Sequence, residues 1–326
     1  MKSKRVKILA FNCHIDYCDN IREELSANGI DCDIKKVDDF QLDCNTLQSR
    51  LKKLREALRK ENEEVNVFIP NSTELYLEEP DFSLMFSGYR SWCDPSRIKI
   101  IPHIWTPTPG LEVSDLKEIK WSKKPDLSVG FMGNSFEASK AAMLTTYLPV
   151  FLKKQILEGK YLRNVALYSR ARVPFRFLPC FVRIEAIRKL EATSLKQDIV
   201  KRNFFKGSSE EVRDFKNHLI RNTYILCPRG SENYSYRFYE ALSFGRVPVL
   251  IDTNMLLPSN VNWDKICLRI PYENISDLEK TIRDDYETRT ESDFNERQEE
   301  ALKIMEELRK WSWLKGIIAQ IALAAQ

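Results

Sequence analysis

Residues 223–253 read TYILCPRGSENYSYRFYEALSFGRVPVLIDT, and this stretch decides the fold class. It opens on an apolar run that predicts a buried strand, followed by a polar loop from Pro228 to Tyr234. Ser235 is placed to cap a helix that stops at Gly245, and a second buried strand is predicted directly after it. A strand, a loop, a helix and a strand in this order are typical of an open parallel sheet, whose ligands bind at the carboxyl ends of the strands.

The same alternation of apolar runs and amphipathic segments continues through the chain, which predicts an α/β fold built on parallel sheets. The predicted strands span residues 6–12, 32–37, 65–70, 98–103, 127–132 and 164–169, and the predicted helices span residues 19–28, 47–61, 137–157 and 208–222. The last of these helices starts with the capping-box sequence Ser208-Ser-Glu-Glu211.

The chain length predicts two domains, because 326 residues exceed what one ordinary core supports. A proline-rich segment at residues 106–110 and the mixed charge after it suit a linker between them. We therefore expect an N-terminal domain over residues 1–125 and a second domain over residues 126–292. Residues 293–326 carry one apolar stripe of helical period, with a break predicted at Lys315-Gly316, and are expected to form a helical segment that packs across both domains.

The balance of charge excludes some function classes. The 51 Lys and Arg residues and the 47 Asp and Glu residues leave a formal net charge of +4, which gives no general attraction for nucleic acid. The eight cysteines and three histidines form no metal-ligand spacing, so no metal site is expected. Dispersed cysteines inside apolar runs are typical of reduced core thiols in a cytoplasmic protein.

The sequence predicts no membrane span. The apolar run after the basic residues at the N-terminus is short and fits a first strand better than a signal peptide. The longest uncharged apolar stretch, residues 316–325, is about half the ~20 residues that a spanning helix needs. This stretch is nevertheless a candidate for peripheral association with a membrane.

Arg229, Arg237 and Glu240 form the candidate binding site. Arg237 falls in the first turn of the predicted helix, where the helix dipole disfavours a cation and a bound anion would remove the conflict. Glu240 follows at i+3 on the same helix face, and its carboxylate is able to accept hydrogen bonds from a ribose diol. The residues alone leave an alternative equally open, in which Arg237 and Glu240 are only an ion pair within the helix.

A longer motif surrounds these residues. It consists of Arg229-Gly230, Ser235, Arg237-Phe238, Glu240-Ala241 and the final Gly245-Arg-Val-Pro248-Val. In this spacing the motif resembles the signature of the exostosin glycosyltransferases, the GT47 grouping, and the later Leu257-Pro258 and Asn262-Trp263 resemble its continuation. The rest of the chain agrees with that family only in length and in the order of strands and helices.

The resemblance implies an inverting transferase of the GT-B fold, in which two Rossmann-like domains face each other across a cleft. It implies a nucleotide-diphosphate sugar as donor, commonly UDP-linked, a glycan or polysaccharide acceptor, and no required metal or other cofactor. Arg237 and Glu240 would then contact the diphosphate and the nucleoside. Arg229, Gly230 and Ser235 would shape the phosphate loop.

Further residues are candidates for the remaining roles. Glu232 would place a carboxylate near the phosphates, where it either repels the donor or contacts its sugar. The base that takes the proton of the acceptor hydroxyl is expected from the N-terminal domain, with His14 and Asp16 as candidates because they follow the first strand. The turn Gly133-Asn134-Ser135 follows the first strand of the second domain and faces the same crevice, although it lacks a P-loop spacing.

Two other functions stay open. One is a fucosyltransferase that uses GDP-fucose, because Glu232-Asn233 and the Gly-x-Val-Pro-Val strand also fit that signature loosely. The other is a glycosyltransferase-like subunit without catalytic activity, because no motif marks the base. Since no membrane anchor precedes the first strand, we expect a bacterial or viral member of the exostosin family that acts in the cytoplasm.

Overall fold

The computed structural model describes parts of both predicted domains. It covers residues 5–10, 15–36, 55–58, 64–70, 77, 79–86, 88, 90, 93–102, 119–135, 178–202, 208–230, 233–309 and 312–325. The helix predicted over residues 137–157 and the strand predicted over residues 164–169 lie outside the described residues, as does most of the helix predicted over residues 47–61.

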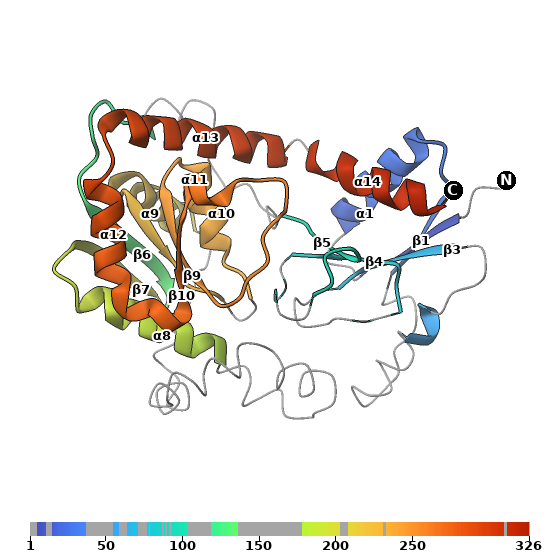
Figure 1. Cartoon of the computed structure of the whole chain (residues 1–326), viewed down its shortest axis with the longest axis horizontal. Helices are drawn as coiled ribbons and strands as arrows, with labels where there is room; N and C mark the ends of the chain where they lie inside the picture. Colours follow the sequence, from blue (N-terminus) through green and yellow to red (C-terminus); the bar gives the residue numbers. More distant parts are fainter. Residues whose placement is uncertain are drawn as a thin grey trace.

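The first domain contains a parallel five-stranded sheet (Figure 1). Its strands are β1 (Arg5–Ala10), β2 (Cys32–Lys36), β3 (Glu64–Ile69), β4 (Phe82–Met85) and β5 (Ile98–Ile100), in the order β2-β1-β3-β4-β5. Helix α1 (Ile15–Ala27) starts four residues before the predicted helix, and the chain leaves it through Gly29 at φ +72°. This left-handed conformation favours glycine, which confirms the predicted stop.

The second domain repeats this architecture. Its strands are β6 (Ser128–Asn134), β7 (Lys196–Arg202), β8 (Tyr224–Cys227), β9 (Val247–Asp252) and β10 (Leu268–Pro271), in the order β10-β9-β8-β6-β7. In both sheets the second strand lies on one side of the first, and the third to fifth strands follow on the other side. The direction of winding therefore changes between β1 and β3 and between β6 and β8, which is where such sheets bind ligands.

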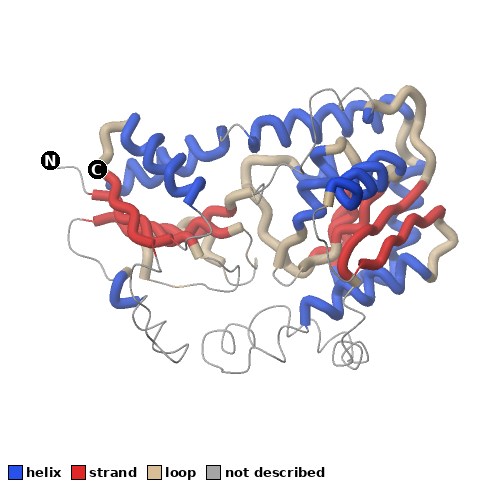
Figure 2. The backbone as a smooth tube through the Cα atoms, turned by 180° about the vertical axis from the view of Figure 1, so that it is seen from behind, coloured by secondary structure: helices blue, strands red, loops and turns tan. Residues whose placement is uncertain are grey.

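Helices cover both faces of the second sheet (Figures 1 and 2). They are α8 (Leu178–Glu191), α9 (Ser209–Arg221), α10 (Tyr236–Ser243), α11 (Trp263–Ile266), η4 (Tyr272–Asp277) and α12 (Leu278–Glu287). One core joins the sheet to α9, α10 and α11, and another joins its opposite face to α8, η4 and α12. Because both faces are buried, the inner strands read as continuous apolar runs. Helix α9 has the predicted capping box, with Ser208 and Glu211 bonded reciprocally.

The C-terminal segment forms two helices, α13 (Glu291–Arg309) and α14 (Ser312–Ala325). The predicted break at Lys315-Gly316 is wrong, because Gly316 lies inside α14 and the first helix ends at Arg309. An interior glycine costs only about 1 kcal/mol, and the apolar residues on either side of it are buried. Helix α13 packs on α10 and α11 of the second domain, whereas α14 packs on α1 and β3 of the first. Figure 2 shows the two helices in line over both domains.

The apolar side of α14 belongs to the core of the first domain. Leu314, Ile317, Ile318 and Ile321 are buried there beside residues of β1, β3 and α1. Leu323 of this helix is exposed. The stretch that the sequence marks for membrane association therefore uses most of its apolar surface inside the protein.

The carboxyl ends of the two sheets face each other. Arg90, which follows β4, donates hydrogen bonds through Nη2 to Asp252 Oδ2 at 2.8 Å and through Nη1 to the Met255 carbonyl oxygen at 2.6 Å. Asp252 is the last residue of β9. Backbone hydrogen bonds from Arg90 to Asn254 and from Leu256 to Gly88 flank this ion pair. The described structure thus consists of two Rossmann-like domains in direct contact at the strand ends where ligands bind.

A buried histidine lies beside the first strand of the second sheet. His218 on α9 is fully buried, and its Nε2 lies 2.9 Å from the backbone oxygen of Asp198 on β7. A Cβ atom on Gly130 would lie 2.8 Å from Cε1 of His218, so the ring needs glycine there. Burial is the main cause that lowers the pKa of His218 to about 4, and the charges of Arg237 and Arg221 act in the same direction.

We expect the stability of the protein to fall as the pH drops from about 6.5 to about 4. Between these values the unfolded chain binds a proton at His218 that the folded chain does not, so His218 contributes a loss of about 3 kcal/mol in total. Chemical unfolding at several pH values measures this slope. His218→Gln should flatten it, and an unchanged slope in that variant would show that other groups cause the pH dependence.

Candidate active site

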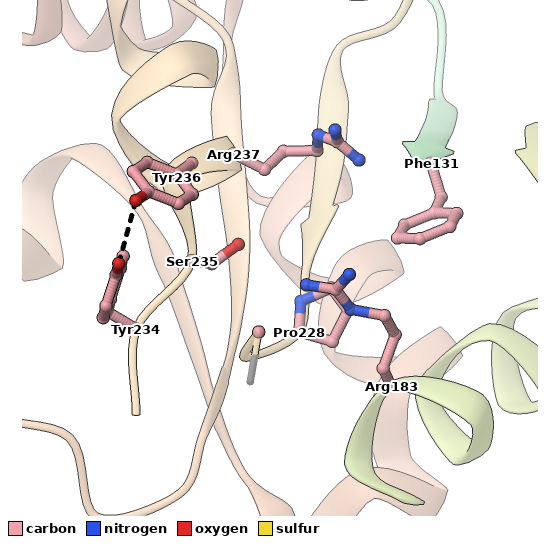
Figure 3. Close-up of a pocket in the computed structure, with 8 residues that line it drawn as sticks. Phe131, Arg183, Pro228, Tyr234, Ser235, Tyr236 and Arg237 are labelled. Carbon is pink, nitrogen blue, oxygen red and sulfur yellow. Dashed lines mark hydrogen bonds between the residues drawn. The ribbon is translucent and has the colours of Figure 1, made fainter. Parts of the chain in front are cut away.

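A pocket of about 150 Å³ lies at the carboxyl end of β8, beside the position where the winding of the second sheet changes. Figure 3 shows the side chains around it. They are Phe131, Arg183, Pro228, Gly230, Tyr234, Ser235, Tyr236 and Arg237. These described lining residues include two arginines and no carboxylate. The pocket is therefore suited to a small anionic group.

Arg237 in the first turn of α10 is the cation that the motif predicts. Its guanidinium carbon lies 5.5 Å from the ring centroid of Phe131 and 5.0 Å from that of Phe215, and the side chain is 19% exposed. Nε lies 3.7 Å from Oε2 of Glu240. Neither of these two atoms has a hydrogen-bond partner within the described part of the chain. Arg237 and Glu240 thus attract each other without satisfying their hydrogen-bonding capacity.

Burial changes the titration of this pair. It lowers the pKa of Arg237, and the nearby carboxylate of Glu240 opposes the change. It raises the pKa of Glu240, which the charge of Arg237 opposes. A charged group that loses water without gaining a full set of hydrogen bonds is destabilised. An anion bound in the pocket would supply Arg237 with the missing acceptors.

The end of β6 lies close to Arg237. The turn predicted at Gly133-Asn134 is wrong, because both residues belong to β6 and pair with β7. A Cβ atom on Gly133 would lie 2.7 Å from Nη1 of Arg237, and Gly133 has φ +157°. Two segments that the sequence marks separately, Gly133 and the Arg237 helix, therefore meet at one edge of the pocket. Of the neighbouring residues, Ser135 is buried and the Asn134 carbonyl oxygen accepts a hydrogen bond from Arg183.

Gly133→Ala is expected to weaken the binding of an anion in this pocket about tenfold, which corresponds to roughly 1.4 kcal/mol. The new methyl group would displace the guanidinium of Arg237, which is the movable end of a flexible side chain. Titration with pyrophosphate measures the change. Gly316→Ala is the control, because its Cβ would meet only Asn260 Nδ2 at 3.8 Å. Unchanged affinity in Gly133→Ala would mean that the end of β6 does not control the position of Arg237.

Ser235 lies at the N-cap position of α10 but does not cap it. Its backbone is extended, with φ −131° and ψ 120°, and its hydroxyl makes no capping hydrogen bond, so the expected cap is wrong. In Figure 3 the hydroxyl lies on the side of Arg237. The first turn of the helix therefore keeps its backbone N–H groups free of this side chain, and the helix dipole favours an anion there.

The residues of the loop before Ser235 differ in whether they line the pocket. Arg229 is fully buried and does not line the pocket, whereas Gly230 does. Gly230 donates its N–H to the Tyr234 carbonyl oxygen at 2.8 Å, which closes the loop. Asn233 is also fully buried and donates through Nδ2 to the Gly88 carbonyl oxygen of the first domain at 3.0 Å. The loop beside the pocket is thus bonded to both domains.

The remaining predicted residues fall outside this pocket or outside the described structure. Glu240 lies beside Arg237 and is not part of the pocket wall. His14 and Glu232 lie outside the described residues, and the side chain of Asp16, in the first turn of α1, is not described. Their roles stay predictions. The sequence interpretation missed Arg183, because no helix is predicted over α8 and no motif includes it.

No group of three or more His, Cys, Asp or Glu residues in the described part of the chain is arranged to hold a metal ion. No helix in the described ranges is long and apolar enough to span a membrane.

Two Rossmann-like domains whose strand ends face each other define the GT-B class of architecture. The chain belongs to the exostosin GT47 family, because the model of the exostosin GT47 domain matches residues 116–284, more than half of the sequence. The predicted fold and the predicted family are both confirmed. The matched region contains the whole pocket wall.

Curated relatives match a smaller part of the chain. A probable glycosyltransferase of Arabidopsis thaliana is 33% identical over 73 residues, which are 22% of this chain and 16% of the relative. A probable glucuronosyltransferase of Oryza sativa subsp. japonica is 29% identical over 91 residues, which are 27% of this chain and 21% of the relative. The alignments therefore span about a sixth to a fifth of these relatives.

Among solved structures, a sucrose-phosphate synthase of Thermosynechococcus elongatus aligns over 99% of this chain and 100% of that chain. The sequence identity is 12% and the TM-score is 0.44.

Proposed function

We propose that this chain is an inverting glycosyltransferase that moves a sugar from a nucleotide-diphosphate sugar, most of all a UDP-sugar, to a glycan acceptor. The observation that carries the proposal is the position of Arg237. It stands at the N-terminus of α10, in a pocket whose described lining residues include no carboxylate, at the strand end where the winding of the sheet changes. Membership of the exostosin family supports the same donor class, as does the similarity to the rice relative, a probable glucuronosyltransferase.

The size of the pocket supports a site for only one part of the donor. Pockets that hold a whole drug-sized ligand have volumes of about 300–1,000 Å³. The 150 Å³ found here suits the diphosphate alone. The nucleoside and the sugar would extend from it between the facing strand ends of the two domains, where the acceptor also has to enter.

The reaction needs two contributions from the protein. The acceptor oxygen attacks the anomeric carbon from the face opposite the diphosphate, a new glycosidic bond forms, and the bond to the phosphate oxygen breaks with its electron pair. Arg237 and the backbone N–H groups of α10 would stabilise the charge that develops on the departing diphosphate. A base of the first domain would take the acceptor proton, and we keep His14 and Asp16 as its candidates.

Ligand-observed NMR with UDP-, GDP-, CMP- and ADP-sugars tests the proposal. We expect UDP-sugars to bind, and donor turnover with a glycan acceptor to give a product of inverted anomeric configuration. Binding of GDP-sugars in place of UDP-sugars would favour a fucosyltransferase. Binding without transfer or donor hydrolysis would favour a subunit without catalytic activity, and no binding of any nucleotide would contradict a transferase.

A further inference from the structure

Arg183 brings a second positive charge to the pocket from a different element. It lies on α8, on the face of the second sheet opposite to α10. Figure 3 shows its guanidinium and that of Arg237 reaching the same pocket from two sides, with Phe131 beside them. Nothing in the sequence motif points to Arg183, because it precedes the motif by 46 residues.

Backbone carbonyl groups fix the position of Arg183. Its Nε donates to the Arg229 carbonyl oxygen at 3.2 Å, and its Nη1 donates to the Asn134 carbonyl oxygen at 3.1 Å. A Cβ atom on Gly230 would lie 3.6 Å from Nη2, so the loop backbone packs against the guanidinium. The two acceptors follow β8 and end β6, the strands between which the winding changes. Both of these acceptors are neutral carbonyl groups, and the two hydrogen bonds orient the guanidinium.

We infer that Arg183 binds one phosphoryl group of a nucleoside diphosphate while Arg237 binds the other, and that Arg183 makes the site selective for diphosphates over monophosphates. This inference rests on the proposed function. Two guanidinium groups that line one small pocket repel each other, and a ligand with two linked phosphoryl groups offsets the repulsion. Each planar guanidinium also matches a phosphoryl group with two parallel N–H donors. A monophosphate would engage only one of the two arginines.

Isothermal titration of the full chain with UDP, UMP, pyrophosphate and orthophosphate tests this inference. In the unmodified protein we expect the diphosphates to bind much more tightly than the monophosphates. Arg183→Gln should weaken UDP and pyrophosphate binding about 10- to 100-fold and change UMP and orthophosphate binding little. Arg183→Lys keeps the charge without the planar fork, so its affinity for UDP and pyrophosphate should lie between that of the unmodified protein and that of Arg183→Gln.

The controls separate the other interpretations. Lys189→Ala on the exposed side of α8 should leave all four affinities unchanged. If Arg183 only holds the two loops in place, its variants should lose affinity for UDP and UMP by the same factor, and this result would overturn the inference. Failure of the unmodified protein to bind any of these ligands would instead contradict the proposed function.

Discussion

Arg237→Met is expected to lower kcat/KM for the donor sugar about 10²- to 10³-fold, the usual effect of removing one donor that stabilises developing charge. The guanidinium lies over the rings of Phe131 and Phe215 and at the N-terminus of α10, so a methionine keeps the apolar packing and removes only the charge and its N–H groups. Initial rates at several donor concentrations measure the effect. We expect kcat to fall and KM to rise, because Arg237 would contact the diphosphate both before and during its departure.

Two variants make the Arg237 result interpretable. Arg237→Lys restores a charge without the planar fork and should recover a small part of the activity. Arg213→Ala removes an exposed arginine from α9 and should leave the kinetics unchanged. Because Arg237→Met leaves Glu240 without its positive neighbour, thermal unfolding has to show that the variant is folded. A folded Arg237→Met protein with full activity would place the diphosphate elsewhere.

Arg297→Met is expected to lower the free energy of unfolding by about 3–5 kcal/mol. Arg297 on α13 donates to Asp285 on α12 through Nη1 at 2.7 Å and Nη2 at 3.2 Å, and through Nε to the Lys265 carbonyl oxygen at 3.0 Å. The side chains of Arg297 and Asp285 are 3% and 8% exposed. Burial alone would raise the pKa of Asp285, but hydrogen bonds from Arg297, Arg289 and Tyr224 lower it overall. Without Arg297 a buried carboxylate loses its main partner.

Urea unfolding measures this loss, and a second substitution identifies its cause. Asp285→Asn in the Arg297→Met background removes the buried charge, which Arg289 and Tyr224 alone compensate less well, and should recover part of the stability. Arg283→Met is the matched control, because its ion pair with Glu279 on α12 is about one-third exposed on each side chain and should contribute much less to stability. If Arg297→Met and Arg283→Met lost the same free energy of unfolding, burial of the Arg297–Asp285 pair would not determine its contribution to stability.

The elements best predicted from the sequence are those with strong local signals. The stretch around α10 has an apolar strand on each side, and Gly245 ends the helix at φ +61°, so β8, α10 and β9 form where the sequence predicts them. Strands β4 and β7 were missed for a physical reason. β4 has only four residues, and one of them is the polar Ser83, which is buried. β7 reads KQDIVKR and lies at the edge of its sheet, where a strand is less buried and does not need a continuous run of apolar residues.

The site was predictable only in part. The motif indicates Arg237 from local spacing alone, but the contact between Gly133 and Arg237 depends on the order of the strands in the sheet. The direction of a loop side chain is equally hidden, which is why Arg229 could be expected in the pocket and is buried instead. Arg183 reaches the pocket from a helix whose apolar and charged residues show no clear helical stripe in the sequence. The cytoplasmic location and a bacterial or viral source stay predictions.

Helix α14 also sets an order of events during translation. The ribosome releases β1 to β5 first, and it adds residues 312–325 only after the whole second domain has been made. Yet Leu314, Ile317, Ile318 and Ile321 fill the core of the first domain. Nascent domains commonly fold in the order in which they are synthesised. In this chain the domain that is synthesised first is completed last.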